Sequence, residues 1–277
     1  MRWLVQENLN SQRNYLDLVH TLKELNIPYL VLAERSGSQR FEILDEISGG
    51  YIENTDEILQ RFIQNQFVMI YGGKKFIDMA DVWGLSPGSF SNENFDFVAL
   101  KNIYGDELLN PDFITGELFH LDPVWDEFFI RPTGNNKLFT GTKMSKQEFI
   151  TWVEDERKKA STKYEGKTIM ISPVKQILAE YRLFILNNNV VSASSYMVDG
   201  VFRTGVKPDN EALGYAKQMI HHFELSKAYV MDIAKTNDGY KIVEFNNLNS
   251  SGFYENDIKA IVHAIQSLQF SKESKPC

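Results

Sequence analysis

The first 90 residues alternate short apolar runs with stretches in which apolar residues recur at helical spacing. Short runs rich in β-branched and aromatic residues are typical of buried strands, and spacings of three and four are typical of amphipathic helices. The pattern predicts strands at 2–6, 28–33 and 67–71 and helices at 13–25 and 55–64. A strand, a helix and a strand within residues 2–33 favour a parallel βαβ unit. A turn-rich connector at 85–91 predicts the end of a small α/β domain, residues 1–90.

The remaining residues, 91–277, carry a pattern more typical of an α+β region. One or two helices are expected within 92–121. Strands are predicted at 127–132, 168–172, 177–186, 190–197, 228–233 and 240–245, and helices at 146–159, 210–223 and 256–270. Ser145 and Glu148 have the spacing of a capping box, which marks the start of the first of these helices. Asparagine-rich or glycine-containing turns at 187–189 and 236–239 predict hairpins.

Three polar residues interrupt the hairpin at 228–246. Asp232 lies in its first apolar strand, and Glu244 and Asn246 alternate onto one face at the end of its second strand. Oxygen-bearing side chains that converge at the end of an apolar sheet are costly unless a cation or hydrogen bonds compensate them. Two carboxylates and an amide suit Mg²⁺, which is bound through one or two carboxylates together with substrate phosphates. The alternative is that Asp232 caps the turn while Glu244 and Asn246 are polar edge residues.

Charged residues elsewhere are candidates for the same site. Arg131 ends an apolar strand and Lys137 follows the polar loop 133–136. Arginine grips phosphate oxygens bidentately and lysine acts as a point charge, so this pair suits a polyphosphate; two solvated hairpin cations are the alternative. Glu180 and Arg182 share one face of their strand, where they form either part of a site or a simple cross-strand ion pair. The sequence Gly72-Gly73-Lys74-Lys75 lacks phosphate-loop spacing and is expected to be an ordinary loop.

Composition excludes several classes of protein. The 277 residues carry a net charge of −8 and no long basic run, which disfavours general binding to nucleic acid. Cys277 is the one cysteine, and the five histidines have no metal-binding spacing, so cysteine-based zinc sites and disulfide scaffolds are excluded. No apolar stretch approaches the length of a membrane span. We therefore expect a cytoplasmic protein with neither nucleic-acid nor membrane partners.

In their order along the chain, these motifs resemble the ATP-grasp superfamily. The order is Arg131 and Lys137 around the loop, ISPV at 171–174, EYRLFI at 180–185, MDI at 231–233 and VEFNNLNSSGFY at 243–254. The resemblance covers about residues 125–265. It is strongest to the divergent branch of bacteria and their phages in which an arginine replaces the first phosphate-binding lysine.

The resemblance implies an ATP-grasp fold of the α/β (α+β) class. A small N-terminal α/β domain, 1–90, would precede the ATP-grasp region, 91–277. Within that region a nucleotide-binding lobe at about 125–175 and a magnesium-binding lobe at about 176–270 would enclose the nucleotide.

The resemblance also implies a role for each matched residue. ATP would be held by Arg131, Lys137, Ser172, Pro173, Val174, Lys175 and Glu180. Mg²⁺ would be held by Asp232, Glu244 and Asn246. Arg182 and Arg203 would face the γ-phosphate and the acyl substrate as the catalytic pair.

The implied activity is ATP- and Mg²⁺-dependent ligation of a carboxylate to an amine through an acyl phosphate. The partner would be a small-molecule carboxylate or a peptide or protein substrate. Two alternatives remain open from the sequence: a phosphotransferase that uses the same pocket, and a non-catalytic ATP-binding module.

Overall fold

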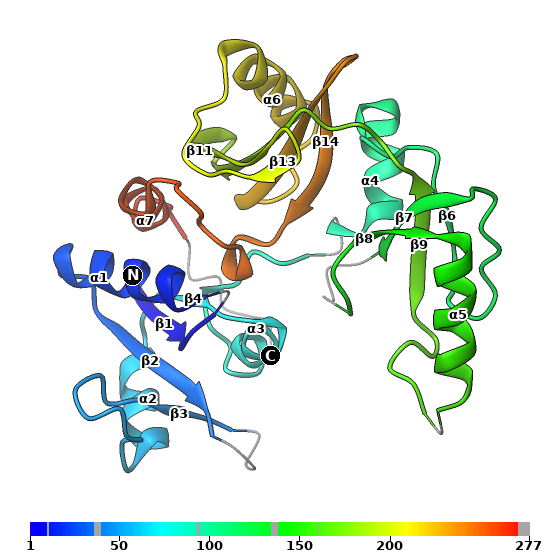
Figure 1. The fold of residues 1–277 in the computed structure, drawn as a ribbon. Helices are drawn as coiled ribbons and strands as arrows, with labels where there is room; N and C mark the ends of the chain where they lie inside the picture. The colour runs from blue at the N-terminus through cyan, green and yellow to red at the C-terminus, as the bar shows by residue number, and fades with distance from the viewer. Residues whose placement is uncertain (10, 36–39, 93–94, 134–137, 160, 271–277) are drawn as a thin grey trace.

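A computed structural model describes residues 1–9, 11–35, 40–92, 95–133, 138–159 and 161–270. Three sheets organise this part of the chain. We call them the N-terminal, middle and C-terminal sheets. In Figure 1 they are the blue strands, the green strands and the yellow-green to orange strands. The mixture of a mainly parallel sheet and two antiparallel sheets agrees with the expected α/β (α+β) class.

The N-terminal sheet contains the predicted βαβ unit. Its strand order is β3-β2-β1-β4-β5, with parallel pairing except between β2 and β3. The strands are β1 (Arg2–Gln6), β2 (Tyr29–Glu34), β3 (Phe41–Ile43), β4 (Val68–Tyr71) and β5 (Pro87–Gly88). The helices are α1 (Gln12–Glu24), α2 (Thr55–Ile63) and α3 (Lys74–Val82). The expectation of a loop at 72–75 is wrong for Lys74 and Lys75, which form the first turn of α3 after Gly73.

The middle sheet has the order β6-β9-β7-β8 and is antiparallel throughout. Its strands are β6 (Ile114–Glu117), β7 (Glu127–Pro132), β8 (Thr142–Ser145) and β9 (Thr168–Pro173), with α4 (Phe97–Tyr104), the 3₁₀ turn η2 (Gly105–Glu107) and α5 (Lys146–Arg157) around them. The capping box is present, since Ser145 and Glu148 each bond the other's backbone N–H. The sequence suggests a hairpin whose second arm is 137–141, but residues 138–141 are irregular. The strand β7 pairs instead with the later strand β8 on one edge and with β9 on the other.

The C-terminal sheet has the order β12-β11-β10-β13-β14 and is antiparallel. Its strands are β10 (Ala179–Leu186), β11 (Asn189–Val198), β12 (Val201–Phe202), β13 (Ala228–Thr236) and β14 (Gly239–Asn246). Beside it lie α6 (Asn210–His222), the 3₁₀ turn η3 (Leu248–Ser250) and α7 (Ile258–Gln266). The predicted hairpin at 228–246 is formed, and Gly239 closes its turn with a φ of 102° that strongly favours glycine.

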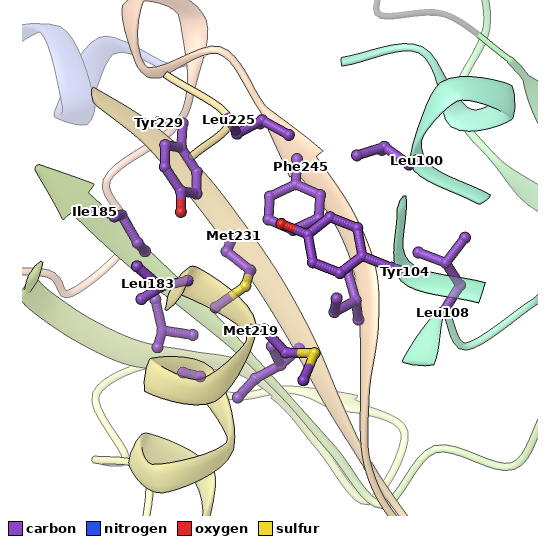
Figure 2. Close-up of a cluster of buried hydrophobic side chains, with 14 of the residues drawn as sticks. Leu100, Tyr104, Leu108, Leu183, Ile185, Met219, Leu225, Tyr229, Met231 and Phe245 are labelled. Carbon is purple, nitrogen blue, oxygen red and sulfur yellow. The ribbon is translucent and has the colours of Figure 1, made fainter. Parts of the chain in front are cut away.

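Alternation along β10 and β13 gives the C-terminal sheet two different apolar faces. Leu183, Ile185 and Met231 face a core shared with α4 and α6. Figure 2 shows these side chains packed with Tyr104 and Phe245, whose rings stack with centroids 5.1 Å apart. Apart from Lys235 near the end of β13, the two strands are therefore apolar on this side, which is typical of a sheet covered by helices.

The opposite face changes character along its length. Phe184 and Val230 pack into a core that also contains Trp3 and Tyr71 of the N-terminal sheet and Ile261 of α7. Arg182 lies two residues from Phe184, and Asp232 lies two residues from Val230. Alternation therefore places Arg182 and Asp232 on the same face of the sheet as Phe184 and Val230. The shared core thus holds the N-terminal sheet against one half of the face and leaves its polar half beside a cavity.

Candidate active site

A cavity of about 950 Å³ is lined by the polar half of the C-terminal sheet, by β7 of the middle sheet and by α1. Arg131 reaches it from β7, and Glu180 and Arg182 reach it from β10. Glu244 and Asn246 reach it from the end of β14. The cavity therefore joins residues that the sequence separates by more than 100 positions.

Asp232, Glu244 and Asn246 are brought together by strand register. Asp232 is directly opposite Glu244 in the β13–β14 ladder. The amide nitrogen Nδ2 of Asn246 donates to Asp232 Oδ2 at 3.3 Å and to Glu244 Oε1 at 2.7 Å. One amide thus bridges two carboxylates at the end of the sheet.

Arg182 holds Asp232 in a bidentate ion pair. Its Nε donates to Oδ1 at 2.9 Å and its Nη2 to Oδ2 at 2.6 Å, and Nη1 donates to the carbonyl of Gly252 at 3.2 Å. Asp232 is 0% exposed. Burial raises the pKa of Asp232 although Arg182 opposes this change. Burial also disfavours the charge on Arg182, but the neighbouring Asp232 raises the pKa of Arg182 above its ordinary value.

A second ion pair joins the middle and C-terminal sheets. Arg131 Nη2 lies 2.6 Å from Glu244 Oε2, and the two side chains are 20% and 25% exposed. The Arg131 guanidinium also lies 5.4 Å from the centre of the Phe97 ring. Burial favours a higher pKa for Glu244, but Arg131, Asn246 and Arg182 together outweigh it and hold this pKa below its ordinary value.

Two tyrosines complete the surroundings of Arg182. The rings of Tyr254 and Tyr196 lie 4.9 and 5.7 Å from its guanidinium carbon, and they stack on each other. The Tyr196 hydroxyl donates to the carboxylate of Glu180, and burial raises the pKa of Glu180. Sequence reasoning missed both tyrosines. Tyr254 closes the quoted motif, but nothing in its sequence context indicates that it contacts Arg182.

The loop after β14 is fixed to the N-terminal sheet through Asn249. Its Nδ2 donates to the carbonyls of Ile70 at 2.6 Å and Gly88 at 3.2 Å, and its Oδ1 accepts from the Phe90 N–H at 2.9 Å. Tyr71 adds a hydrogen bond from its hydroxyl to the Ser251 carbonyl at 2.8 Å. These contacts fix the backbone that accepts a hydrogen bond from Arg182. No sequence pattern indicates these contacts, because Asn249 resembles any polar loop residue.

The other predicted site residues lie at different places. Val174 and Lys175 line the cavity in the connection between β9 and β10. Ser172 is buried in β9 and its hydroxyl has no hydrogen-bond partner among the described residues. Pro173 ends β9, and neither it nor Ser172 lines the cavity.

Two further predicted residues, Arg203 and Lys137, are not seen in the lining of the cavity, for different reasons. Arg203 is exposed after β12 and is not among the described residues that line the cavity. Lys137 lies outside the described residues. Gly141 does line the cavity, and a Cβ there would lie 2.5 Å from the Phe129 ring and 3.3 Å from Arg131 Cβ, so only glycine fits beside Arg131.

The residues of the polar triad suit one kind of metal site. Across the described residues, no three His, Cys, Asp or Glu side chains form a metal-binding group. The set that converges here is instead Asp232, Glu244 and the amide of Asn246. Two carboxylates and one amide oxygen leave coordination positions open for phosphate oxygens and water, which suits Mg²⁺ better than a metal held entirely by protein.

In the described segments, no helix combines the length and apolar character needed to cross a membrane.

A family model described as the ATP-grasp domain, R2K clade family 3, matches residues 105–265, more than half of the chain. The chain is therefore an ATP-grasp protein. Within that superfamily it belongs to family 3 of the R2K clade. A search of curated proteins returns no match.

Solved structures show the same fold. A D-alanine–D-alanine ligase from Bacillus anthracis, complexed with ATP, is 13% identical with a TM-score of 0.61; the match covers 96% of this chain and 97% of that one. The D-cycloserine synthetase DcsG is 12% identical with a TM-score of 0.55, covering 95% and 97%. A RimK domain ATP-grasp protein from Sphaerobacter thermophilus is 10% identical with a TM-score of 0.56, covering 90% and 92%. The expected ATP-grasp fold is thus confirmed.

Proposed function

We propose that the protein is an ATP-dependent ligase that joins a carboxylate to an amine through an acyl phosphate. The observation that carries this proposal is one cavity lined by Arg131, Arg182, Glu244 and Asn246. Asp232 is buried directly behind this lining, where it is hydrogen-bonded to Arg182 and Asn246. Membership of the ATP-grasp superfamily supports ATP as the nucleotide. Two structural relatives, a D-alanine–D-alanine ligase and a D-cycloserine synthetase, support carboxylate–amine ligation.

Asp232, Glu244 and Asn246 would hold Mg²⁺. When bound, Mg²⁺ supplies charge neutralisation for the phosphates of ATP and for the charge that moves during phosphoryl transfer. The donor set supports this assignment because it combines two carboxylates with an amide and leaves room for phosphate oxygens.

Arg131 would hold the phosphates from the opposite side. Its guanidinium already binds a carboxylate, Glu244, and the geometry that suits a carboxylate also suits a phosphate. Arg182 has a different role, because Asp232 and the Gly252 carbonyl occupy one hydrogen on each of its three nitrogens. It would orient Asp232 and leave one N–H on each terminal nitrogen for a phosphate or acyl oxygen.

The reaction needs no side-chain nucleophile. A carboxylate oxygen of the substrate attacks the γ-phosphorus as the bond to the β-phosphate oxygen breaks, which gives an acyl phosphate and ADP. The amine nitrogen then attacks the acyl carbon and inorganic phosphate leaves with the acyl C–O bond electrons. Positioning and electrostatic stabilisation account for catalysis in this scheme.

The test combines ATP, Mg²⁺, hydroxylamine and a pool of amino acids and short carboxylic acids. We expect ADP formation that depends on the acid pool, and a hydroxamate trapped from the acyl phosphate. Asp232→Asn should lower the rate by at least ~10²-fold, because the change weakens a metal ligand. Asp238→Asn, in the exposed β13–β14 turn away from the cavity, is the matched control and should leave the rate unchanged.

Two results would contradict the ligase. A stable phosphorylated product without hydroxamate would identify a phosphotransferase. Full activity of the Asp232→Asn variant would show that the Asp232 carboxylate has no role in the reaction.

A further inference from the structure

Aromatic side chains form a continuous surface beside the ion pairs, and the reaction scheme gives this surface no role. The rings of Tyr196 and Tyr254 stack with centroids 5.3 Å apart and an interplanar angle of 14°. Phe202 meets Tyr254 edge to face at 5.9 Å. All three residues line the cavity. We call Tyr196, Tyr254 and Phe202 the aromatic shelf.

Phe202 is held outward on a fixed backbone. Phe202 is 68% exposed, which is unusual for a phenylalanine. The next residue is tied to β11, since Arg203 N–H donates to the Tyr196 carbonyl at 3.1 Å and Ser195 Oγ donates to the Arg203 carbonyl at 2.7 Å. An exposed ring on an ordered backbone is already organised for binding, because little conformational entropy remains to be lost.

Tyr254 is also fixed in an uncommon conformation. Its φ is 51°, in the left-handed region that bulky residues rarely adopt. The preceding Phe253 N–H donates to Asn14 Oδ1 of α1 at 2.8 Å, and the Arg182 guanidinium lies against the Tyr254 ring. The surrounding contacts therefore hold the ring in the cavity against a local conformational cost.

Strand order separates the shelf from the phosphate end of the cavity. Phe202 belongs to β12, at one edge of the C-terminal sheet, and Glu244 with its partner Arg131 lies at the other edge, β14. On the shelf side, Tyr254 is followed by Glu255, whose carboxylate lies 2.8 Å from Arg13 of α1. The shelf therefore faces the part of the cavity enclosed by α1.

We propose that the aromatic shelf is a specificity subsite for an aromatic side chain carried by the amino-acid or peptide substrate. The proposal rests on the ligase function, which requires a second ligand beside ATP. A substrate ring can pack against Phe202 and Tyr254 in offset or edge-to-face geometry while its reacting group lies toward Arg182. Small side chains such as alanine lack the area to make this contact.

The experiment measures binding without turnover, by ligand-observed NMR in the presence of Mg²⁺ and a non-hydrolysable ATP analogue. The probes are phenylalanine and alanine, as D and L amino acids and as the dipeptides Phe-Phe and Ala-Ala. We expect the best phenylalanine compound to bind about ten-fold more tightly than its alanine counterpart. Phe202→Ala should abolish this preference and Phe202→Trp should keep it.

Val201→Ala is the matched control, because Val201 is 64% exposed on the same short strand but does not line the cavity. It should leave every affinity unchanged. In Phe202→Ala the affinity for the ATP analogue should stay within about two-fold of the wild-type value. Phe202 lies far from the phosphate end of the cavity, and distant sites usually contribute independently.

Three results would overturn the subsite: equal affinity for phenylalanine and alanine compounds, no binding of either, or an ATP affinity that falls in Phe202→Ala. A fall in ATP affinity would indicate that the aromatic shelf binds the base of the nucleotide. Because these readouts need no reaction, a preference for aromatic ligands without hydroxamate formation would leave the subsite standing and remove the ligase. Hydroxamate formation without a preference for aromatic ligands would support the ligase and remove the subsite.

Discussion

Two arginine–carboxylate pairs meet at Asn246, and they differ in how the fold holds them. Arg182 and Asp232 are opposite each other on neighbouring strands of one sheet, and Asp232 is fully buried. Arg131 comes from the middle sheet and reaches Glu244 at the edge of the C-terminal sheet. The first pair is set by a backbone ladder, whereas the second depends on how two sheets approach each other.

The electrostatic consequences also differ. Burial raises the pKa of Asp232, whereas Arg131 and its neighbours hold the pKa of Glu244 below its ordinary value. A buried pair is strongly destabilised when one partner is removed, and a partly exposed pair contributes little. We infer that Arg182–Asp232 is a fixed structural unit and that Arg131–Glu244 is free to rearrange when phosphates enter the cavity.

The largest expected effect separates the pairs by stability. Asp232→Ala leaves the buried Arg182 charge without its carboxylate and should lower the free energy of unfolding by about 3–5 kcal/mol. Glu244→Ala should cost only about 1 kcal/mol. Urea denaturation of both variants measures the difference.

A double variant provides the control for that experiment. Arg182→Met with Asp232→Leu removes both buried charges and should recover most of the lost stability. Equal losses in Asp232→Ala and Glu244→Ala would contradict the distinction between a fixed and a movable pair.

The next effect concerns nucleotide affinity. Arg131→Ala should weaken ATP binding by about 1.5–3 kcal/mol, because it removes a charge-assisted phosphate contact, with no loss of fold. Titration calorimetry in Mg²⁺ at fixed ionic strength measures it. Lys101→Ala is a suitable control, since this lysine is an exposed cation on α4 that does not line the cavity. An unchanged affinity in Arg131→Ala would return Arg131 to the alternative of a simple ion-pairing cation.

The smallest effect is a pH dependence. A carboxyl group whose pKa is lowered by folding stabilises the protein above its unfolded pKa, and this stabilisation is lost as the pH falls through the folded pKa. Glu244 is such a group. The stability difference between wild type and Glu244→Gln, about 1 kcal/mol at neutral pH, should therefore shrink below about pH 4.3. A stability difference between wild type and Glu244→Gln that persists or grows in acid would contradict this prediction.

Local sequence patterns predicted the elements that depend on neighbouring residues. The hairpin at 228–246 follows from two apolar strands and a glycine turn, and α5 follows from its capping box. The short strands β3, β5, β6 and β12 were missed, because each has too few residues to produce a clear periodic signal. Helix α3 was missed, and its first two residues, Lys74 and Lys75, were predicted to be a loop because two glycines precede them.

Strand alternation and hairpin pairing were enough to predict which polar residues lie close together in the site. Alternation placed Glu180 with Arg182 and Glu244 with Asn246, and the hairpin brought Asp232 to them. The partners of these residues were not predictable. Asn249 contacts Ile70 and Gly88 across more than 150 positions, and a single sequence carries no pattern for packing between distant segments. The roles assigned to all the site residues stay predictions, and Ser172, Pro173 and Arg203 are not among the described residues that line the cavity.

The movement of Arg131 from Glu244 to phosphate is tested most directly by ATP binding without Mg²⁺. In the wild-type protein, a phosphate must displace Glu244 from Arg131. Glu244→Gln keeps the shape of the side chain and removes its charge, so it should strengthen metal-free ATP binding by about ten-fold, while it weakens binding in the presence of Mg²⁺. The gain should vanish in the double variant Arg131→Ala/Glu244→Gln. Metal-free affinity that is unchanged or weaker in Glu244→Gln would contradict the account.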